Sequence, residues 1–288
     1  MRASGLRHYV TSYFAFKRKT INLLQGIEML QAYFEKYQSE CLSESFPVKL
    51  LVDYNWYQHT QPAIADITWM PYHMMLDEFA SELANTINEL VRLTHRLSCW
   101  EKTITPLDDS EKLDVLLEFV FDPATVAINL QYVIRSRFIF ATAHLCHQAN
   151  RALQQTTWLD DLAMDDEIYF KQADQYGAPW KSYGKLKLAL EKIANKDFQS
   201  STFDFRNKYN HRFAPCIELG MSGFVTRQVD KKSGQVTYSL GSLPALKLPN
   251  IVELLWKQID ICRAAFSCFQ VLVHDHLAAI GGTTTKTL

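Results

Sequence analysis

The sequence predicts an all-α protein, a bundle of long helices that leaves room for one small β-hairpin. Apolar residues recur at three- and four-residue steps over long stretches, and this spacing places them on one face of a helix. The chain has only 10 glycines and 9 prolines in 288 residues, whereas proteins with many tight β-turns usually need more of both. No repeat of fixed period is found, so a bundle is favoured over a solenoid.

The first predicted element is a long amphipathic helix from about Leu6 to Tyr37. An irregular connector follows from Ser43 to Pro71, because prolines and isolated aromatic residues interrupt any regular pattern there. Its apolar run from Val48 to Val52 fits a strand or a buried turn. We therefore expect residues 1–71 to form a long helix and a connector that pack on a helical bundle of residues 72–288, in one continuous domain.

Three more long helices are predicted within the bundle. The first runs from Pro71 to between Trp100 and Ile104, and the second, a central apolar helix, runs from Ala124 to about Leu153. Between them, the run Asp108-Asp109-Ser110-Glu111 supplies capping residues for a helical segment. The last long helix begins after Pro249-Asn250 and ends near Gly281-Gly282.

Shorter elements fill the rest of the chain. Residues Leu153 to Gly184 are expected to be mostly loop with one short helix, and Lys185 to Ala194 to be helical. A further helix from Phe203 to Phe213 would be capped by Ser200, Ser201 and Thr202 and stopped by Pro215. Phe224 to Leu240 alternates apolar and polar residues, which predicts a hairpin or a mobile loop, and Thr283 to Leu288 is expected to be a frayed tail.

Charge and composition restrict the functions that the chain can have. The formal net charge is -1 and the pI is near 6.7, so any contact with nucleic acid must be local. The six cysteines form no CxxC pair, which suits the reducing cytoplasm. Neither a signal-peptide core nor the roughly 18 uninterrupted apolar residues of a membrane span are found, so we expect a cytoplasmic protein without membrane contact.

The most distinctive local feature is the segment Arg206-Asn207-Lys208-Tyr209-Asn210-His211. It resembles the R-x4-to-6-H motif of HEPN domains, including the polar residue that often follows the arginine. HEPN domains are helical bundles in which this motif precedes the last long helix, and here the predicted helix from Ile251 to Ile280 follows it. The resemblance implies a HEPN-like bundle over about Tyr72 to Ile280 and a metal-independent endoribonuclease with Arg206 and His211 as catalytic residues.

The residue types suit that chemistry. Cleavage of RNA without a metal needs a base for the 2′-hydroxyl, an acid for the leaving 5′-oxygen and a cation near the phosphorane. An imidazole exchanges a proton near neutrality, and a guanidinium grips phosphate oxygens with two parallel N–H donors. A step of five residues turns side chains by about 140° on a helix, so Arg206 and His211 need not touch within one chain.

The resemblance also implies partners. In HEPN nucleases two copies of the motif meet across a dimer interface, so we expect a homodimer that cuts RNA. The resemblance also implies that the protein acts as a toxin or antiviral-defence effector and is controlled by an antitoxin or regulatory partner. Asn207 would orient the catalytic pair or contact RNA, with Lys208 and Arg212 as supporting cations. Residues 201–236 carry six basic and three acidic side chains, an excess that suits a phosphate backbone. No cofactor or metal is expected.

Two other functions stay open, besides the structural interpretation in which Arg206 and His211 are ordinary polar groups on a solvated helix face, paired with Asp204 or Glu218. The first is a non-catalytic HEPN-like interaction or nucleotide-binding module. The second is a metalloenzyme that uses His144, Cys146 and His147, although no second ligand pair at zinc spacing is evident.

Several other groups are expected to be structural. The histidines His274 and His276 should lie on different faces of their helix and line a surface or an interface, where one of them could support the cleft. Four aromatic residues of the connector are expected to pack on the core and not to stack on bases: Tyr54, Trp56, Tyr57 and Trp69. The acidic run from Asp160 to Glu167 is expected to be a solvated loop.

Overall fold

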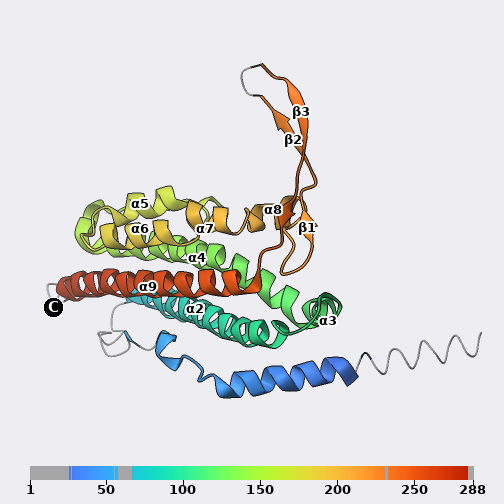
Figure 1. Ribbon diagram of the computed structural model, residues 1–288. Coiled ribbons are helices and arrows are strands. Elements are labelled where there is room, and N and C mark those ends of the chain that lie inside the picture. The colour runs from blue at the N-terminus through green and yellow to red at the C-terminus, as the bar shows by residue number, and fades with distance from the viewer. Residues whose placement is uncertain (1–25, 27, 55, 58–66, 231–232, 285–288) are drawn as a thin grey trace, which may run out of the picture.

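The computed structural model describes residues 26, 28–54, 56–57, 67–230 and 233–284. Within them, β-structure is confined to two small antiparallel sheets and the other regular elements are helices, as Figure 1 shows. The predicted all-α fold with a small hairpin is confirmed. In this described part of the chain, no helix combines the length and the apolar character needed to cross a membrane.

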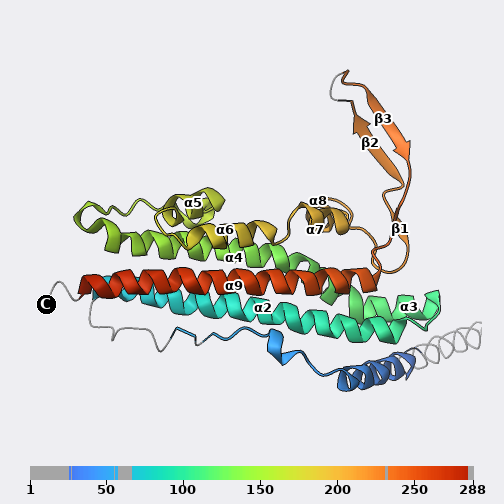
Figure 2. The same ribbon diagram turned by 60° about the vertical axis from the view of Figure 1, so that its left-hand side comes forward.

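Three long helices form the centre of the molecule: α2 (Met70–Ile104), α4 (Phe121–Gln154) and α9 (Leu248–Thr284). Helix α9 packs along both α2 and α4, and both views show this arrangement (Figures 1 and 2). Large side chains from all three helices are fully buried between them, among them Leu76, Phe138, Phe266 and Phe269. Burial of each such side chain stabilises the fold by roughly 1.5–3 kcal/mol.

Helix α9 does not end at the glycine pair where the sequence suggested an end. Gly281 and Gly282 both lie inside the helix, which continues to Thr284. A glycine ends a helix when it takes a positive φ angle, and neither glycine does so. The predicted frayed tail lies outside the described residues from residue 285 onward.

A short helix leads into α4. Helix α3 (Asp109–Val115) begins with predicted capping residues, because Asp108 accepts from the backbone N–H of Glu111 at 2.9 Å and Glu111 accepts from that of Asp108 at 3.1 Å. A π-helical turn, η4 (Leu116–Val120), joins α3 to α4 without a break. Pro123 then lies in the first turn of α4, just after this π-helical turn.

Four short helices lie along α4 on the side away from α2 in both views (Figures 1 and 2). These helices are α5 (Phe170–Gly177), α6 (Tyr183–Lys192), α7 (Lys196–Ser201) and α8 (Phe205–His211). Helices α5 and α6 agree with the sequence prediction. The 3-10 turns η5 (Gln155–Thr157) and η6 (Asp165–Glu167) lie in the loop before α5.

The predicted caps of the motif helix are wrong. Ser200 and Ser201 lie in the last turn of α7, a helix that the sequence did not predict, and the Thr202 hydroxyl donates to the carbonyl of Phe198 at 2.9 Å. Asn195 caps α7 by accepting from the backbone N–H of Phe198 at 3.0 Å. The motif helix α8 is therefore shorter than predicted and starts only at Phe205.

A hairpin between α8 and α9 projects away from the bundle (Figures 1 and 2). Strand β2 (Val225–Val229) pairs with β3 (Val236–Leu240), and all ten of their residues are exposed. At its base, β1 (Met221–Ser222) pairs with β4 (Leu243–Pro244). The predicted hairpin is confirmed, and it packs none of its strand side chains into the core.

Residues 28–43 form a helix that lies outside α2 (Figures 1 and 2). The predicted helix of Leu6 to Tyr37 thus extends past its expected end, and its part before residue 26 lies outside the described residues. Aromatic stacking holds this helix to the bundle, because the Trp100 ring lies between Tyr37 (4.2 Å between ring centroids) and Phe119 (4.8 Å).

The connector is irregular, as predicted. Its apolar run forms the 3-10 turn η1 (Val48–Leu50) and not a strand, and the turn η3 (Ile67–Trp69) precedes α2. The side chain of Asn88 accepts from the backbone N–H of Val52 at 2.8 Å and donates to its carbonyl at 3.0 Å, which fixes the connector on α2. Core packing is confirmed for Tyr57 and Trp69, whereas Tyr54 is exposed.

Candidate active site

Helix α8 carries the motif, and its entry is set by two residues with left-handed backbone. Phe203 (φ 53°) and Asp204 (φ 57°) turn the chain sharply out of α7, and the buried ring of Phe205 then anchors α8. The side chains of Gln199 and Asn207 both donate to the Asp204 carboxylate, at 2.6 and 2.8 Å. Partial burial opposes ionisation of Asp204, but these two hydrogen bonds outweigh it and lower the pKa of the carboxyl.

Arg206 and His211 lie at opposite ends of α8, yet both line one surface pocket of about 230 Å³. Both side chains are exposed to solvent. The guanidinium of Arg206 lies over the ring of Tyr132 from α4, 4.6 Å from its centroid, in the geometry of a cation–π contact. This contact can hold the Arg206 side chain in place beside the pocket.

The two carboxylates that the sequence offers as ion-pair partners of the motif are engaged elsewhere. Asp204 is held by the two side-chain amides, and Glu218 accepts from the backbone N–H of Leu248 at 2.8 Å and pairs with Lys247 at 3.5 Å. The structure therefore does not have the surface ion pairs with Asp204 or Glu218 that the purely structural interpretation expected for Arg206 and His211.

The three residues predicted to support the catalytic pair differ in their relation to the pocket. Asn207 lines the pocket and is bonded to Asp204, so it shapes the entry of α8 directly. Arg212 is exposed and Lys208 is half-buried, and the charges of both stabilise the ionised Asp204. The pocket thus has two cations beside it in addition to Arg206.

A larger hollow of about 540 Å³ continues from this pocket along α4 and shares three of its lining residues, Tyr132, Arg206 and Asn210. It adds Tyr209 and Arg137, and a third hollow of about 460 Å³ begins at Arg137 and reaches Glu82 of α2. We call this run of hollows the α4 groove. No sequence signal pointed to Tyr132 or Arg137, because only tertiary packing brings α4 next to α8.

The residues of the alternative metal site do not converge. His147 approaches Asp160 (2.9 Å) and His144 approaches Asp165 (3.3 Å), whereas the thiol of Cys146 faces His276 in the core (3.5 Å). Burial lowers the pKa of His144, although Asp165 partly offsets it. The acidic loop is exposed, as expected, and two of its carboxylates, Asp160 and Asp165, also pair with the two histidines.

The two histidines near the end of α9 do lie on different faces, as predicted, but His276 lines no surface. It is fully buried, with the hydroxyl of Tyr72 at 3.0 Å and the ring of Trp180 at 4.4 Å between centroids. Burial lowers the pKa of His276 to about 3. The expectation that it lines a surface or supports the cleft is wrong, whereas His274 is exposed and contacts Trp56.

One group of metal-ligating side chains was missed by the sequence analysis. Among the described residues, the ligand atoms of Cys41, His95 and Cys99 all lie within 4.8 Å of one another. The spacing of His95 and Cys99, four residues apart on one helix, was an available signal. Cys41 gave none, because it belongs to another helix.

Comparison of the chain with protein-family models, with curated proteins and with solved structures gives no match. The HEPN assignment therefore stays a prediction that rests on the motif residues and on the order of the elements around them.

Proposed function

We propose that the chain is a metal-independent endoribonuclease whose active site is the pocket lined by Arg206 and His211. The observation that supports this most directly is that both side chains are exposed on one pocket, with the neighbouring acid Asp204 already occupied by amide donors. A guanidinium beside a solvent-accessible imidazole can receive a phosphodiester without first breaking an ion pair.

The reaction assigns one task to each group. A neutral imidazole of His211 removes the proton of a 2′-hydroxyl, whose oxygen attacks the adjacent phosphorus. Arg206 binds the phosphate oxygens and stabilises the charge of the phosphorane. The P–O5′ bond breaks, the leaving oxygen takes up a proton, and the products are a 2′,3′-cyclic phosphate and a 5′-hydroxyl.

A homodimer supplies what one chain lacks. A single imidazole cannot be both the proton acceptor and the proton donor of one concerted step, whereas two copies of His211 can divide these tasks. An exposed aromatic residue next to the motif offers an interface for the second copy, since Phe213 is 93% exposed. Isolated apolar residues are common on surfaces, but large aromatic side chains beside a candidate site favour protein contact.

The α4 groove offers a path for single-stranded RNA. Tyr132 and Tyr209 present aromatic rings on which bases can stack, and Arg206 and Arg137 supply positive charge along the same hollow. Arg137 also pairs with Glu82 at 3.0 Å, so RNA would compete with that exposed pair.

The test uses labelled single-stranded RNA in EDTA with wild type, Arg206→Ala and His211→Ala. We expect wild type to cut and each variant to cut at least about 100-fold more slowly, because each loses one catalytic group. A single 2′-deoxy substitution at a mapped cut site should prevent cleavage there, because it removes the nucleophile. Arg227→Ala, at an exposed hairpin position, is the matched control and should cut as wild type does.

Cleavage that needs a divalent metal, or that survives His211→Ala unchanged, would contradict the proposal. The resemblance further suggests a toxin or antiviral-defence effector with a regulatory partner, so expression of wild type should arrest growth and expression of His211→Ala should not. Equal growth of both strains, together with uncut RNA, would favour the alternative of a non-catalytic HEPN-like module.

A further inference from the structure

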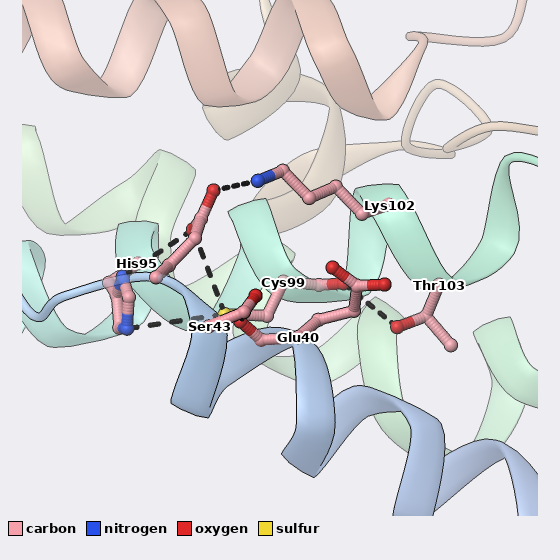
Figure 3. Close-up of polar contacts among 7 residues, drawn as sticks. Glu40, Ser43, His95, Cys99, Lys102 and Thr103 are labelled. Carbon is pink, nitrogen blue, oxygen red and sulfur yellow. Dashed lines mark hydrogen bonds and ion pairs between the residues drawn. The ribbon is translucent and has the colours of Figure 1, made fainter.

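The helix of residues 28–43 meets α2 at a cluster of metal-ligating side chains. His95 and Cys99 project from successive turns of α2, and Cys41 approaches them from the other helix. The His95 Nε2 atom lies 4.0 Å from Cys99 Sγ (Figure 3). His95 and Cys99 are buried and Cys41 is half-buried, so an ion could enter from the Cys41 side.

A fourth candidate ligand, a carboxylate oxygen of Glu44, lies beside these three groups. Glu44 follows Cys41 by three residues, and its Oε2 lies 3.9 Å from His95 Nδ1 and 4.0 Å from Cys99 Sγ. The other carboxylate oxygen of Glu44 pairs with Lys102, which projects from α2 one turn after Cys99 (Figure 3). One Glu44 oxygen therefore faces the cluster while the other is held by a cation.

We propose that Cys41, Glu44, His95 and Cys99 bind one Zn²⁺ ion in a tetrahedral site. Two thiolates, an imidazole and a carboxylate are ligand types that zinc takes in proteins. Ligand atoms about 2.0–2.3 Å from a tetrahedral ion lie about 3.3–3.8 Å apart, so the ligand atoms of Cys41, His95 and Cys99, which lie within 4.8 Å of one another, and the Glu44 oxygen must move closer together around the ion. Side-chain rotation can provide that movement without a change of fold.

The charges of such a site would balance. The two thiolates and the Glu44 carboxylate carry three negative charges, which the ion and Lys102 together neutralise. Burial of an uncompensated charge would be costly, so this balance favours a divalent ion over a monovalent one. Lys102 also orients the carboxylate, as a residue behind a metal ligand commonly does.

The site would fasten the helix of residues 28–43 to α2, because Cys41 belongs to that helix, Glu44 directly follows it, and His95 and Cys99 belong to α2. It lies on the far side of the bundle from α8 in both views (Figures 1 and 2). The ion would therefore have a structural role, and its presence does not depend on the proposed ribonuclease activity.

The test measures metal in the full-length chain purified without chelators or metal-affinity resin. Elemental analysis should find about one zinc per chain in wild type and less than a tenth of that in Cys41→Ser and Glu44→Gln. Cys268→Ser changes another half-buried cysteine outside the cluster and should keep the zinc of wild type. Co²⁺ added to the metal-free wild type should give thiolate charge-transfer bands and the visible bands of tetrahedral cobalt.

A second set of measurements distinguishes the loss of a zinc ligand from unfolding of the variants. Zinc added to the metal-free wild type should raise its melting temperature, because a ligand that binds only the folded state stabilises it, and circular dichroism should show both variants folded before metal is added. Wild type without bound zinc and without cobalt bands would overturn the proposal. So would a Cys41→Ser variant that retains full zinc content.

Discussion

At the scale of single residues, burial decides what each histidine of this chain can do. His211 is exposed on the candidate site, whereas His276 is enclosed by Tyr72, Cys146 and Trp180 and has a pKa near 3. An imidazole that stays neutral across the physiological pH range serves as a hydrogen-bonding core group and not as a proton carrier.

His276 makes the stability of the fold depend on pH. The unfolded chain protonates this residue below about pH 6.5, but the folded chain does so only near pH 3. The contribution of neutral His276 to the free energy of unfolding is therefore complete above pH 6.5 and decreases as the pH falls from 6.5 towards 3. We expect His276→Gln to lose about 2 kcal/mol at pH 7 and to take up about one proton fewer on unfolding in acid.

Urea unfolding at a series of pH values measures both effects. His274→Gln is the matched control, since His274 lies on the same helix but is exposed, and it should unfold as wild type does. If the free energy of unfolding depends on pH in the same way below pH 6.5 in wild type and in His276→Gln, the burial assigned to His276 is contradicted.

The motif residues of the site could be found from the sequence, but their surroundings could not. Arg206 and His211 are separated by a recognisable spacing, and the sequence alone singled them out. Tyr132, which stacks on Arg206, is 74 positions away, and nothing in its local sequence indicates that α4 passes under α8. The same limit applies to Cys41 and Cys99, which belong to different helices.

At the scale of elements, the sequence predicted helices correctly where the periodic pattern of apolar residues was long. The three central helices have many periodic apolar residues and recognisable starts, so their extents were predicted within a few residues. Helix α7 was missed because its six residues bury only Phe198, which leaves no periodicity to detect. The π-helical turn η4 was also not predicted, although Pro123, which has no backbone N–H, follows it closely.

The hairpin of β2 and β3 should be dispensable for folding, because all ten strand residues are exposed. Replacing residues 223–242 by Asn-Gly would close the chain on the β1–β4 ladder, between the paired residues Ser222 and Leu243, with a two-residue turn. We expect the helical circular dichroism signal to persist and the melting temperature to change by less than about 4 °C. Loss of cooperative unfolding would show that the hairpin contributes to the core.

At the scale of the whole molecule, the proposed dimer depends on the apolar surface beside α8. Phe213→Glu should give a monomer of 33.3 kDa in light scattering, whereas wild type should have twice that mass, because a charge in the centre of an interface is unfavourable. RNA cleavage should fall together with dimer content. Leu240→Glu, at an equally exposed position in the hairpin, should remain dimeric and active.

A wild type that is monomeric at the concentrations where it cuts RNA would contradict the composite site. A Phe213→Glu monomer with full activity would do the same. Circular dichroism of both variants checks that the substitutions leave the helices intact.

The stack of Tyr37, Trp100 and Phe119 gives this protein an intrinsic optical reporter. Trp100 is almost fully enclosed, and one face of its indole is covered only as long as the helix of residues 28–43 stays in place. Release of that helix would admit water to the ring and shift its fluorescence to longer wavelength. Because the chain has six tryptophans, the difference in fluorescence between wild type and Trp100→Phe isolates this signal and follows docking of the amino-terminal helix without any attached dye.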